Sequence, residues 1–237
     1  MQAYTTLQKG HLHRHFCEDA ILSLPLGNYG FIGAVSDGCS SGTDSHLASA
    51  LTCKLIRKIV LNYPQDREMP VREQALQILH RFMQEMKQTK NQLALSSDEM
   101  LATLSLLIYS SVQNSACVVM LGDGALAINE EIKEIDHDNR PDYPVYHLEK
   151  QEHWQEYFEK QTFVIDAPSQ VAIASDGVFS FQQVSHETTG IVPANYLLTD
   201  RFLHENAGML NRKCNILNKM HGLQPADDLG IVRLILN

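Results

Sequence analysis

Aspartate–glycine steps follow apolar runs at widely separated points of this sequence. The run from Tyr29 to Val35 leads into Ser36-Asp37-Gly38, and similar units recur at Gly122-Asp123-Gly124 and at Asp176-Gly177. A further acidic step, Asp227-Asp228, directly precedes the final apolar run. A buried strand ends where its last side chain can leave the sheet, and glycine there allows a turn or a close backbone approach. Each aspartate alone is equally typical of a turn, but together they predict carboxylates that surround a cation.

The chemistry of such a cluster follows from its charge. Carboxylates that meet raise one another's pKa, so the cluster needs a cation to stay ionised. Carboxylate, carbonyl and water oxygens suit Mg²⁺ or Mn²⁺. Two ions about 3.5–4 Å apart that share an aspartate promote in-line attack of water on phosphorus. The chain carries a net charge of -9, so these ions and Arg14 would have to supply the positive field for a phosphate substrate.

Composition limits the class of protein. With 237 residues and 44% hydrophobic content, the chain is expected to form one large domain over residues 1–237. Its acidic balance disfavours nucleic acid and anionic membranes as partners, and its apolar runs are shorter than the roughly 20 residues of a membrane span. The first nine residues have no signal-peptide core, and five irregularly spaced cysteines indicate reduced thiols. We therefore expect a cytoplasmic protein.

Hydrophobic periodicity predicts the elements that position the aspartates. Strands are expected at 20–26, 29–36, 102–110, 115–121, 124–129, 162–166, 170–175 and 229–236. Helices are expected from Thr43-Asp44-Ser45 to about Pro64, from Pro70 to Lys90, and at 151–160, 194–206 and 208–220, with Leu47, Ala50, Leu51, Leu55 and Ile59 on the core face of the first. Residues 132–149 read as a polar, flap-like loop. Strands that pair locally and helices that come in pairs predict an α+β fold with antiparallel sheets.

An ordered series of motifs resembles a known family. HRHFCED, VSDG, ATLSLLI, LGDG, ASDGV and DDLGIVRLI follow one another as in the metal-dependent serine/threonine protein phosphatases of type 2C (the PPM family), especially the compact bacterial members. The resemblance spans about Gly10 to Leu236, and the ordered series is more specific than any one motif. It implies a four-layer α-β-β-α sandwich of two antiparallel sheets flanked by helix pairs, with a two-metal centre between the sheets.

The resemblance also implies roles for individual residues. Asp37 matches the aspartate that bridges two Mn²⁺ or Mg²⁺ ions, Gly38 the glycine that offers its carbonyl, and Asp176 and Asp227 the other direct ligands. Glu18 and Asp19 match the acidic pair that binds or orients metal-bound water. Arg14 matches the phosphate-binding arginine, although a surface pair with Glu18 is an alternative. Asp98 matches a position that can hold a third, weaker metal ion, or else it caps a helix or turn. Asp123 is expected to support the metal ligands rather than to bind a metal itself. The 132–149 loop matches the variable flap that governs substrate choice.

Departures from the family pattern concern the general acid. Many members carry His-Gly-Gly after Asp-Gly, where this chain has Cys39-Ser40-Ser41. A cysteine is a poor proton donor at neutral pH unless its pKa is tuned, so metal-bound water or His13 is the candidate acid. Cys39 is also a candidate oxidation-sensitive thiol, whereas the other four cysteines are expected to pack. Gly124 replaces a usual serine, and Asp228 replaces the commoner asparagine.

The sequence thus predicts a phosphoprotein phosphatase that hydrolyses phosphoserine and phosphothreonine and opposes a serine/threonine kinase. The alternative is an inactive or weakly active pseudophosphatase that binds phosphoproteins, suggested by the missing histidine. No arginine stands six positions after any cysteine, which excludes the cysteine phosphatases. The lack of a P-loop argues against a P-loop nucleotidase, and the lack of an early Asp-x-Asp disfavours an aspartyl-phosphate mechanism. The alternating His11, His13 and His15 lack further ligands at zinc spacing.

Overall fold

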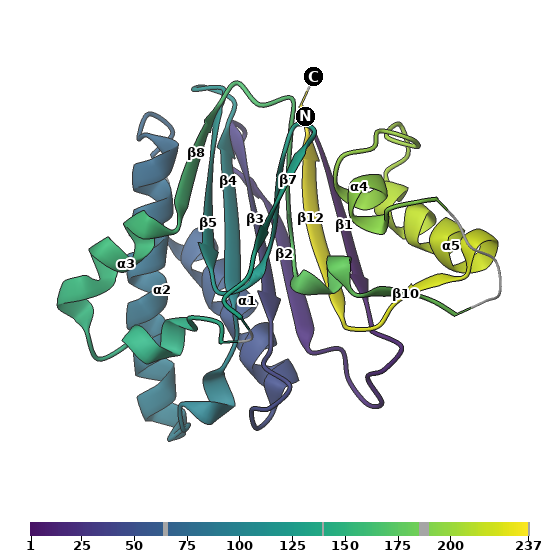
Figure 1. The fold of residues 1–237 in the computed structure, drawn as a ribbon. Coiled ribbons are helices and arrows are strands. Elements are labelled where there is room, and N and C mark those ends of the chain that lie inside the picture. The colour runs from purple at the N-terminus through teal and green to yellow at the C-terminus, as the bar shows by residue number, and fades with distance from the viewer. Residues whose placement is uncertain (64–65, 139, 185–189, 237) are drawn as a thin grey trace.

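Two five-stranded antiparallel sheets face each other in the computed structural model, which describes residues 1–63, 66–138, 140–184 and 190–236 (Figure 1). The first sheet has the strand order β1 (Gln2–Gln8), β12 (Leu229–Ile235), β9 (Gln170–Ala174), β6 (Gly124–Ile128) and β7 (Glu131–Ile135). The second has the order β2 (Asp19–Leu26), β3 (Gly30–Asp37), β4 (Leu104–Ser110), β5 (Ser115–Leu121) and β8 (Thr162–Asp166). A separate ribbon pairs β10 (Phe181–Gln183) with β11 (Leu223–Pro225).

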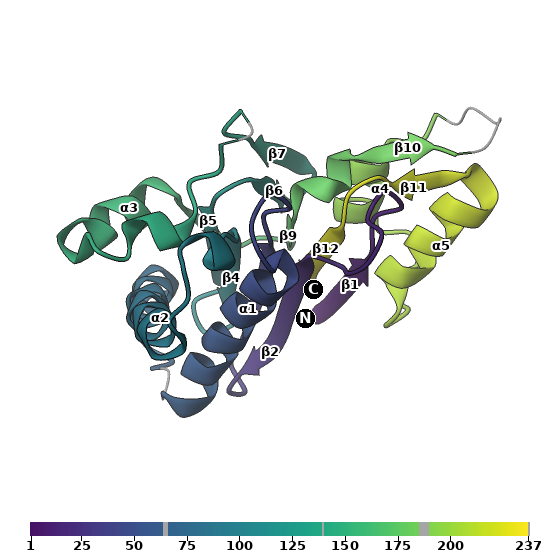
Figure 2. The same ribbon diagram turned by 90° about the horizontal axis from the view of Figure 1, so that it is seen from below.

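Helices cover the outer face of each sheet (Figures 1 and 2). The helices α1 (Ser45–Asn62), α2 (Val71–Leu93) and α3 (Trp154–Lys160) pack on the β2–β8 sheet, and α4 (Pro193–Leu198) and α5 (Met209–His221) pack on the other. This arrangement confirms the predicted α+β, four-layer α-β-β-α sandwich. No helix in the described ranges is both long and apolar enough to cross a lipid bilayer.

Alternation along the central strands explains the layers. In β3, Ile32 and Ala34 pack toward the helices, whereas Phe31 and Val35 pack between the sheets. A Cβ atom on Gly33 would lie 2.5 Å from Val232 Cγ1 on the facing strand β12, so glycine there lets the two sheets approach. Successive side chains on opposite faces give each central strand one helix-facing and one sheet-facing row. The strands are therefore buried on both sides, as their continuous apolar runs predict.

The two long helices differ in how well their core faces were predicted. The buried residues of α2 include Ala75, Leu79 and Phe82, as the helical period predicts. In α1 the core face runs through Ala48, Leu55, Ile56 and Ile59, whereas Leu47 is 43% exposed. Leu55 and Ile59 are buried as predicted, but the prediction of Leu47 as a core residue was wrong, because the buried face centres on Ala48, Thr52 and Ile56 and Leu47 lies outside it. Pro64, the predicted stop of this helix, lies outside the described residues.

Several elements were missed or misplaced. The polar N-terminus forms edge strand β1, in which the alternate residues Tyr4 and Thr6 are buried. The predicted loop 132–149 begins with β7, whose Ile135 pairs with Gly124. The predicted helix 194–206 already ends at Leu198, because Arg233 binds the carbonyl oxygens of Leu197 and Asp200 from the neighbouring strand. These pairings join residues far apart in sequence, which local periodicity does not encode.

Candidate active site

Neighbouring strands bring the predicted aspartates to one edge of the sandwich. Asp19 opens β2 and lies directly opposite Asp37 at the end of β3. In the other sheet, Asp176 follows β9 and Asp227 precedes β12, and these strands are adjacent. The Ser175 hydroxyl joins the sheets here: it donates to Asp19 Oδ2 at 2.6 Å and accepts from the Gly230 amide at 2.9 Å.

The carboxylates lie close enough to raise one another's pKa values. Burial, together with the charges of Asp19, Asp176 and Asp227, holds the pKa of Asp37 well above its usual range. Burial and the charges of Asp228 and Asp176 outweigh the hydrogen bond from Ser175 and raise the pKa of Asp19 to about 7. The pKa of Asp176 is raised to about 6 by burial and by Asp227 and Asp123. Carboxylates from both sheets thus form one coupled group, which we call the acidic cluster: Asp19, Asp37, Asp176 and Asp227.

The acidic cluster fits a divalent cation in its donor chemistry. Asp19 is 5% exposed, and its Oδ1 atom is a buried oxygen without a hydrogen-bond partner among the described residues. The Asp227 side chain is 48% exposed, so the cluster opens to solvent on one side. Carboxylate oxygens are the ligands that Mg²⁺ and Mn²⁺ prefer. Within the described ranges no three His, Cys, Asp or Glu side chains already form a group that could hold a metal, so binding requires the carboxylates to turn toward a common ion.

The glycines beside the aspartates are required by close backbone approach. A Cβ atom on Gly38 would lie 2.1 Å from the Ser45 carbonyl oxygen at the start of α1. A Cβ atom on Gly177 would lie 1.8 Å from the Asp228 carbonyl oxygen. Any side chain at either position would push apart the segments that carry the aspartates. Gly38 and Gly177 are therefore needed because the backbone packs tightly around the acidic cluster, and not only because the chain turns there.

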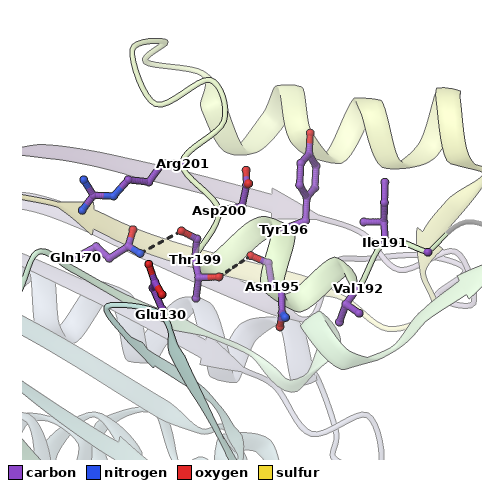
Figure 3. A pocket seen from close by; sticks show the side chains of 10 residues that line it. Glu130, Gln170, Ile191, Val192, Asn195, Tyr196, Thr199, Asp200 and Arg201 are labelled. Atoms are coloured by element: carbon purple, nitrogen blue, oxygen red, sulfur yellow. Dashed lines mark hydrogen bonds between the residues drawn. The ribbon is translucent and has the colours of Figure 1, made fainter.

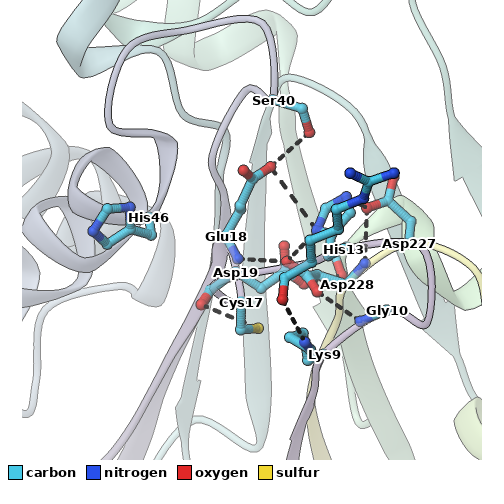
Figure 4. A network of polar contacts seen from close by, with 12 residues as sticks. Lys9, Gly10, His13, Cys17, Glu18, Asp19, Ser40, His46, Asp227 and Asp228 are labelled. Atoms are coloured by element: carbon cyan, nitrogen blue, oxygen red, sulfur yellow. Dashed lines mark hydrogen bonds and ion pairs between the residues drawn. The ribbon is translucent and has the colours of Figure 1, made fainter.

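Asp228 anchors the N-terminal loop to the same edge (Figure 4). Its side chain is 1% exposed; Oδ1 accepts from the Gly10 amide at 2.6 Å, and Oδ2 accepts a short hydrogen bond from the Glu18 amide. His13 lies between the two adjacent aspartates, with Nδ1 2.8 Å from Asp228 Oδ2 and Nε2 3.1 Å from Asp227 Oδ1. Burial lowers the pKa of His13, but the hydrogen bond to Asp228 and the surrounding carboxylates outweigh it and raise the pKa overall. Sequence analysis missed this anchoring role, whose only sign was an aspartate at a position where asparagine is commoner.

Glu18 and Arg14 are the other charged side chains of the N-terminal motif to which a role was assigned. Glu18 Oε2 accepts a hydrogen bond from Ser40 Oγ at 2.6 Å, which links the motif to the loop after Gly38. Arg14 is exposed, and its guanidinium forms no ion pair with the described carboxylates, including the alternative partner Glu18. Lys9 Nζ lies 3.4 Å from the Arg14 carbonyl oxygen. Arg14 is thus free to meet an anion at this edge.

The structure does not bring Asp98 into the acidic cluster. Asp98 begins a short 3-10 helix (Asp98–Met100), is exposed, and its carbonyl oxygen accepts from the Thr43 amide at 3.3 Å. Asp123 lies closer: it raises the pKa of Asp176, and its Oδ1 lies 2.5 Å from His137 Nδ1. A cavity of about 260 Å³ lies between Asp123 and Asp176.

The flap reaches the loop that follows Gly38. A cavity of about 350 Å³ is lined on one side by Cys39 and Ser41 and on the other by Arg140, Tyr143 and Tyr146. Cys39 Sγ lies 3.1 Å from Ser41 Oγ. Burial raises the pKa of this thiol, but hydrogen bonds from Ser41, Tyr143 and backbone amides outweigh it and lower the pKa overall.

A cavity larger than these, of about 750 Å³, lies at the opposite end of the sheets (Figure 3). It is bordered by α4 and by Gln170, whose side-chain amide donates to the Thr199 carbonyl at 3.1 Å. Gln170 is the first residue of β9 and lies at the cavity, whereas Asp176 of the acidic cluster follows Ala174, the last residue of this strand. The cavity and the acidic cluster therefore lie at opposite ends of β9. Its size does not make it the candidate active site, because the coupled carboxylates lie elsewhere.

Comparison with known proteins identifies the family to which the chain belongs. The family model for protein phosphatase 2C matches residues 8–212, and the chain belongs to this family. The match spans the N-terminal motif and three of the four members of the acidic cluster.

Solved structures share the fold at low sequence identity. A point-mutant form of a bacterial serine phosphatase aligns with a TM-score of 0.66 at 14% identity, covering 100% of this chain and 99% of the other. The serine/threonine phosphatase Stp1 from Staphylococcus aureus aligns with a TM-score of 0.59 at 13% identity, covering 99% and 94%. RsbX, solved in complex with magnesium, aligns with a TM-score of 0.55 at 15% identity, covering 98% and 92%. A comparison with curated proteins gave no match.

Proposed function

We propose that this protein is a metal-dependent phosphatase that removes phosphate from phosphoserine and phosphothreonine in proteins. The observation that carries the proposal is the meeting of Asp37, Asp176 and Asp227 from two different sheets, next to the unpartnered Oδ1 atom of Asp19. The raised pKa values of Asp19, Asp37 and Asp176 show that their ionised forms are unfavourable unless a cation joins them. Membership of the protein phosphatase 2C family supports the reaction class.

Each residue of the cluster has a proposed task. Asp37 would be shared by two Mn²⁺ or Mg²⁺ ions, with the Gly38 carbonyl, Asp176 and Asp227 as further direct ligands. Asp19 and Glu18 would hold and orient water beside the ions. When bound, the ions lower the pKa of a water molecule and neutralise charge on the phosphoryl oxygens. Asp98 remains a proposed third, weaker site, and Asp123 a residue that supports Asp176.

Substrate binding would rest on Arg14. Its exposed guanidinium has no ion pair with the described residues and lies in the loop that Asp228 anchors beside the cluster. A guanidinium binds two phosphate oxygens with parallel hydrogen bonds. Both ring nitrogens of His13 already contact Asp227 and Asp228, which favours a positioning role for this histidine over proton donation to the leaving group.

The setting that we propose is a cytoplasmic one, in which the enzyme opposes a serine/threonine kinase. All five cysteines are free, which suits a reducing compartment.

Hydrolysis of a phosphothreonine peptide tests the proposal. We expect phosphate release with Mn²⁺ or Mg²⁺, none with a chelator, and a loss of at least about 1,000-fold in kcat for Asp37→Asn. Asp166→Asn, at the far end of β8, is the matched control and should keep wild-type turnover. Saturable metal binding without turnover on any phosphopeptide would contradict the enzyme and favour a phosphoprotein-binding module instead.

A further inference from the structure

We propose that Phe16 and His46 form a platform that binds a large apolar side chain next to the phosphorylated residue of the substrate protein. This inference rests on the proposed function and adds a rule for substrate choice to it. We call the pair the Phe16–His46 platform.

The platform is an exposed aromatic stack. The rings of Phe16 and His46 lie 4.4 Å apart with an interplanar angle of 20°, and Phe16 is nevertheless 61% exposed. One face of the phenyl ring is therefore braced and oriented while much of its surface stays open to water. Leu12 in the same loop is 63% exposed, and Leu47, next to His46, is 43% exposed. The two segments that meet in the stack thus carry further exposed apolar side chains, and contiguous exposed apolar surface is typical of interaction sites, whereas single exposed residues are not.

The platform is fixed relative to the acidic cluster by the backbone. His46 lies in the first turn of α1, directly after Ser45, whose carbonyl oxygen leaves no room for a Cβ on Gly38. Phe16 stands two residues after Arg14 and two before Glu18, in the loop held by Asp228. Figure 4 shows Glu18 between His46 on one side and His13 with Asp227 on the other. Arg14 and Phe16 lie two residues apart in one loop, so we expect a peptide whose phosphate meets Arg14 to reach the Phe16 ring with a neighbouring side chain.

Charge identifies the occupant. The segment that carries Phe16 also carries the exposed Arg14, whose guanidinium forms no ion pair with the described carboxylates, whereas the acidic Glu18 and Asp19 follow it in the chain. A bound segment therefore needs a negative group for Arg14 and an apolar group for the ring, which a phosphorylated residue beside an apolar one provides. An anionic membrane or a nucleic acid would meet the repulsion of the rest of the surface. We commit to a phosphoprotein segment with an aromatic or large aliphatic neighbour of the phosphoresidue.

Paired phosphopeptides test the platform. The two peptides of each pair differ only in a phenylalanine or an alanine beside the phosphoserine, and the flanking position is varied across pairs. For the wild type we expect kcat/KM to be roughly two- to ten-fold higher for the phenylalanine peptide at the preferred position, the size expected for one aromatic contact. Phe16→Ala should bring this ratio close to one, and Phe16→Tyr should restore it. Phe202→Ala, which removes another phenylalanine that is 55% exposed but lies outside the platform, should keep the wild-type ratio.

Binding measurements separate this inference from the proposed function. The same peptides are titrated against Asp37→Asn, with and without Phe16→Ala, and followed by fluorescence anisotropy. If Asp37→Asn binds the phenylalanine peptide more tightly but the wild type hydrolyses no phosphoester, the platform is supported and the proposed enzyme activity is refuted. A wild type without preference in both assays, or a Phe16→Ala variant that weakens both peptides equally, would overturn the platform. Loss of self-association in Phe16→Ala by sedimentation would likewise overturn it, in favour of a second copy of the chain as occupant.

Discussion

Two groups of charges lie in different parts of this sandwich, and they are satisfied in opposite ways. The acidic cluster has carboxylates that raise one another's pKa and a buried oxygen without a partner among the described residues. Between the β1–β7 sheet and its helices, Lys213 and Arg233 are both fully buried; we call them the cationic pair. Here main-chain oxygens replace the lost water.

The cationic pair is almost completely hydrogen-bonded. Arg233 donates from Nη1 to the carbonyls of Leu197 and Asp200, at 2.8 and 2.9 Å, and from Nη2 to Thr199 and Gln170 Oε1. Lys213 Nζ donates to the Tyr196 carbonyl at 2.7 Å and to Asp200 Oδ1 at 2.8 Å. These carbonyls come from the end of α4 and the turn after it, where intrahelical donors are missing. The cationic pair therefore stabilises the end of α4, whereas the carboxylates of the acidic cluster repel one another.

The largest expected effect on stability is at the cationic pair. Arg233→Met should lower the free energy of unfolding by about 3 kcal/mol, because it leaves several buried carbonyls without donors. Urea unfolding of the metal-free protein measures this change. A variant as stable as the wild type would show that the pair does not hold α4 and its turn.

Substitution in the acidic cluster should have the opposite sign. Asp37→Asn should raise the free energy of unfolding of the metal-free protein by about 1 kcal/mol, because it removes one of several interacting carboxylates. The same variant should lose the increase in Tm that Mn²⁺ gives the wild type by binding the folded state. The measurement is a thermal melt with chelator and with Mn²⁺. A destabilised metal-free variant would show that Asp37 has a structural rather than a ligand-binding role.

The acidic cluster and the cationic pair should also differ in how their contributions to stability depend on pH. The folded-state pKa values of Asp19 and Asp176, about 7 and about 6, lie above the ordinary 3.8, so the folded state binds protons more tightly than the unfolded one. Their contribution to stability is therefore full below about pH 4 and is lost as the pH rises through 6 to 7. At the cationic pair, burial raises the pKa of Asp200, but its hydrogen bond to Lys213 outweighs this and lowers the pKa, so its contribution is lost only in acid.

Urea midpoints of the metal-free protein between about pH 5 and pH 8 check this expectation. They should fall as the pH rises, and Mn²⁺ should abolish the decline because it replaces the protons. A decline that persists unchanged in Asp37→Asn and with Mn²⁺ would place its origin outside the acidic cluster.

An effect similar in size to that of Asp37→Asn, but opposite in sign, is expected at Asp228. Asp228→Asn keeps one oxygen for the Gly10 or Glu18 amide but loses the other acceptor, so we expect a loss of about 1 kcal/mol in unfolding free energy. KM for a phosphopeptide should rise more than kcat falls, because the loop that carries Arg14 loosens. A pure kcat effect would instead assign Asp228 to the metal ligands.

How far the sequence predicted the molecule depends on the range of the interactions. Asp37 and Asp176 each stand beside a glycine at a strand end, a local pattern, and the structure brings them together. Nothing local marks Lys213, in a polar stretch of α5, or Arg233, in an apolar strand, as partners of the turn after α4. The early end of α4 follows from the hydrogen bonds of Arg233, and the exposure of Leu47 follows from the face that α1 turns toward the sheet. Local patterns thus predicted which carboxylates come together, while long-range hydrogen bonds set the boundaries of the elements.

Calorimetric titration of Mn²⁺ into the chelator-treated protein tests the central claim most directly. If carboxylates from both sheets surround a pair of divalent ions, the wild type should bind about two ions per chain. Asp37→Asn and Asp176→Asn should each reduce that number or weaken the binding at least about tenfold, whereas Asp166→Asn should not. The absence of saturable binding at millimolar Mn²⁺, or equal binding in all four proteins, would contradict the claim.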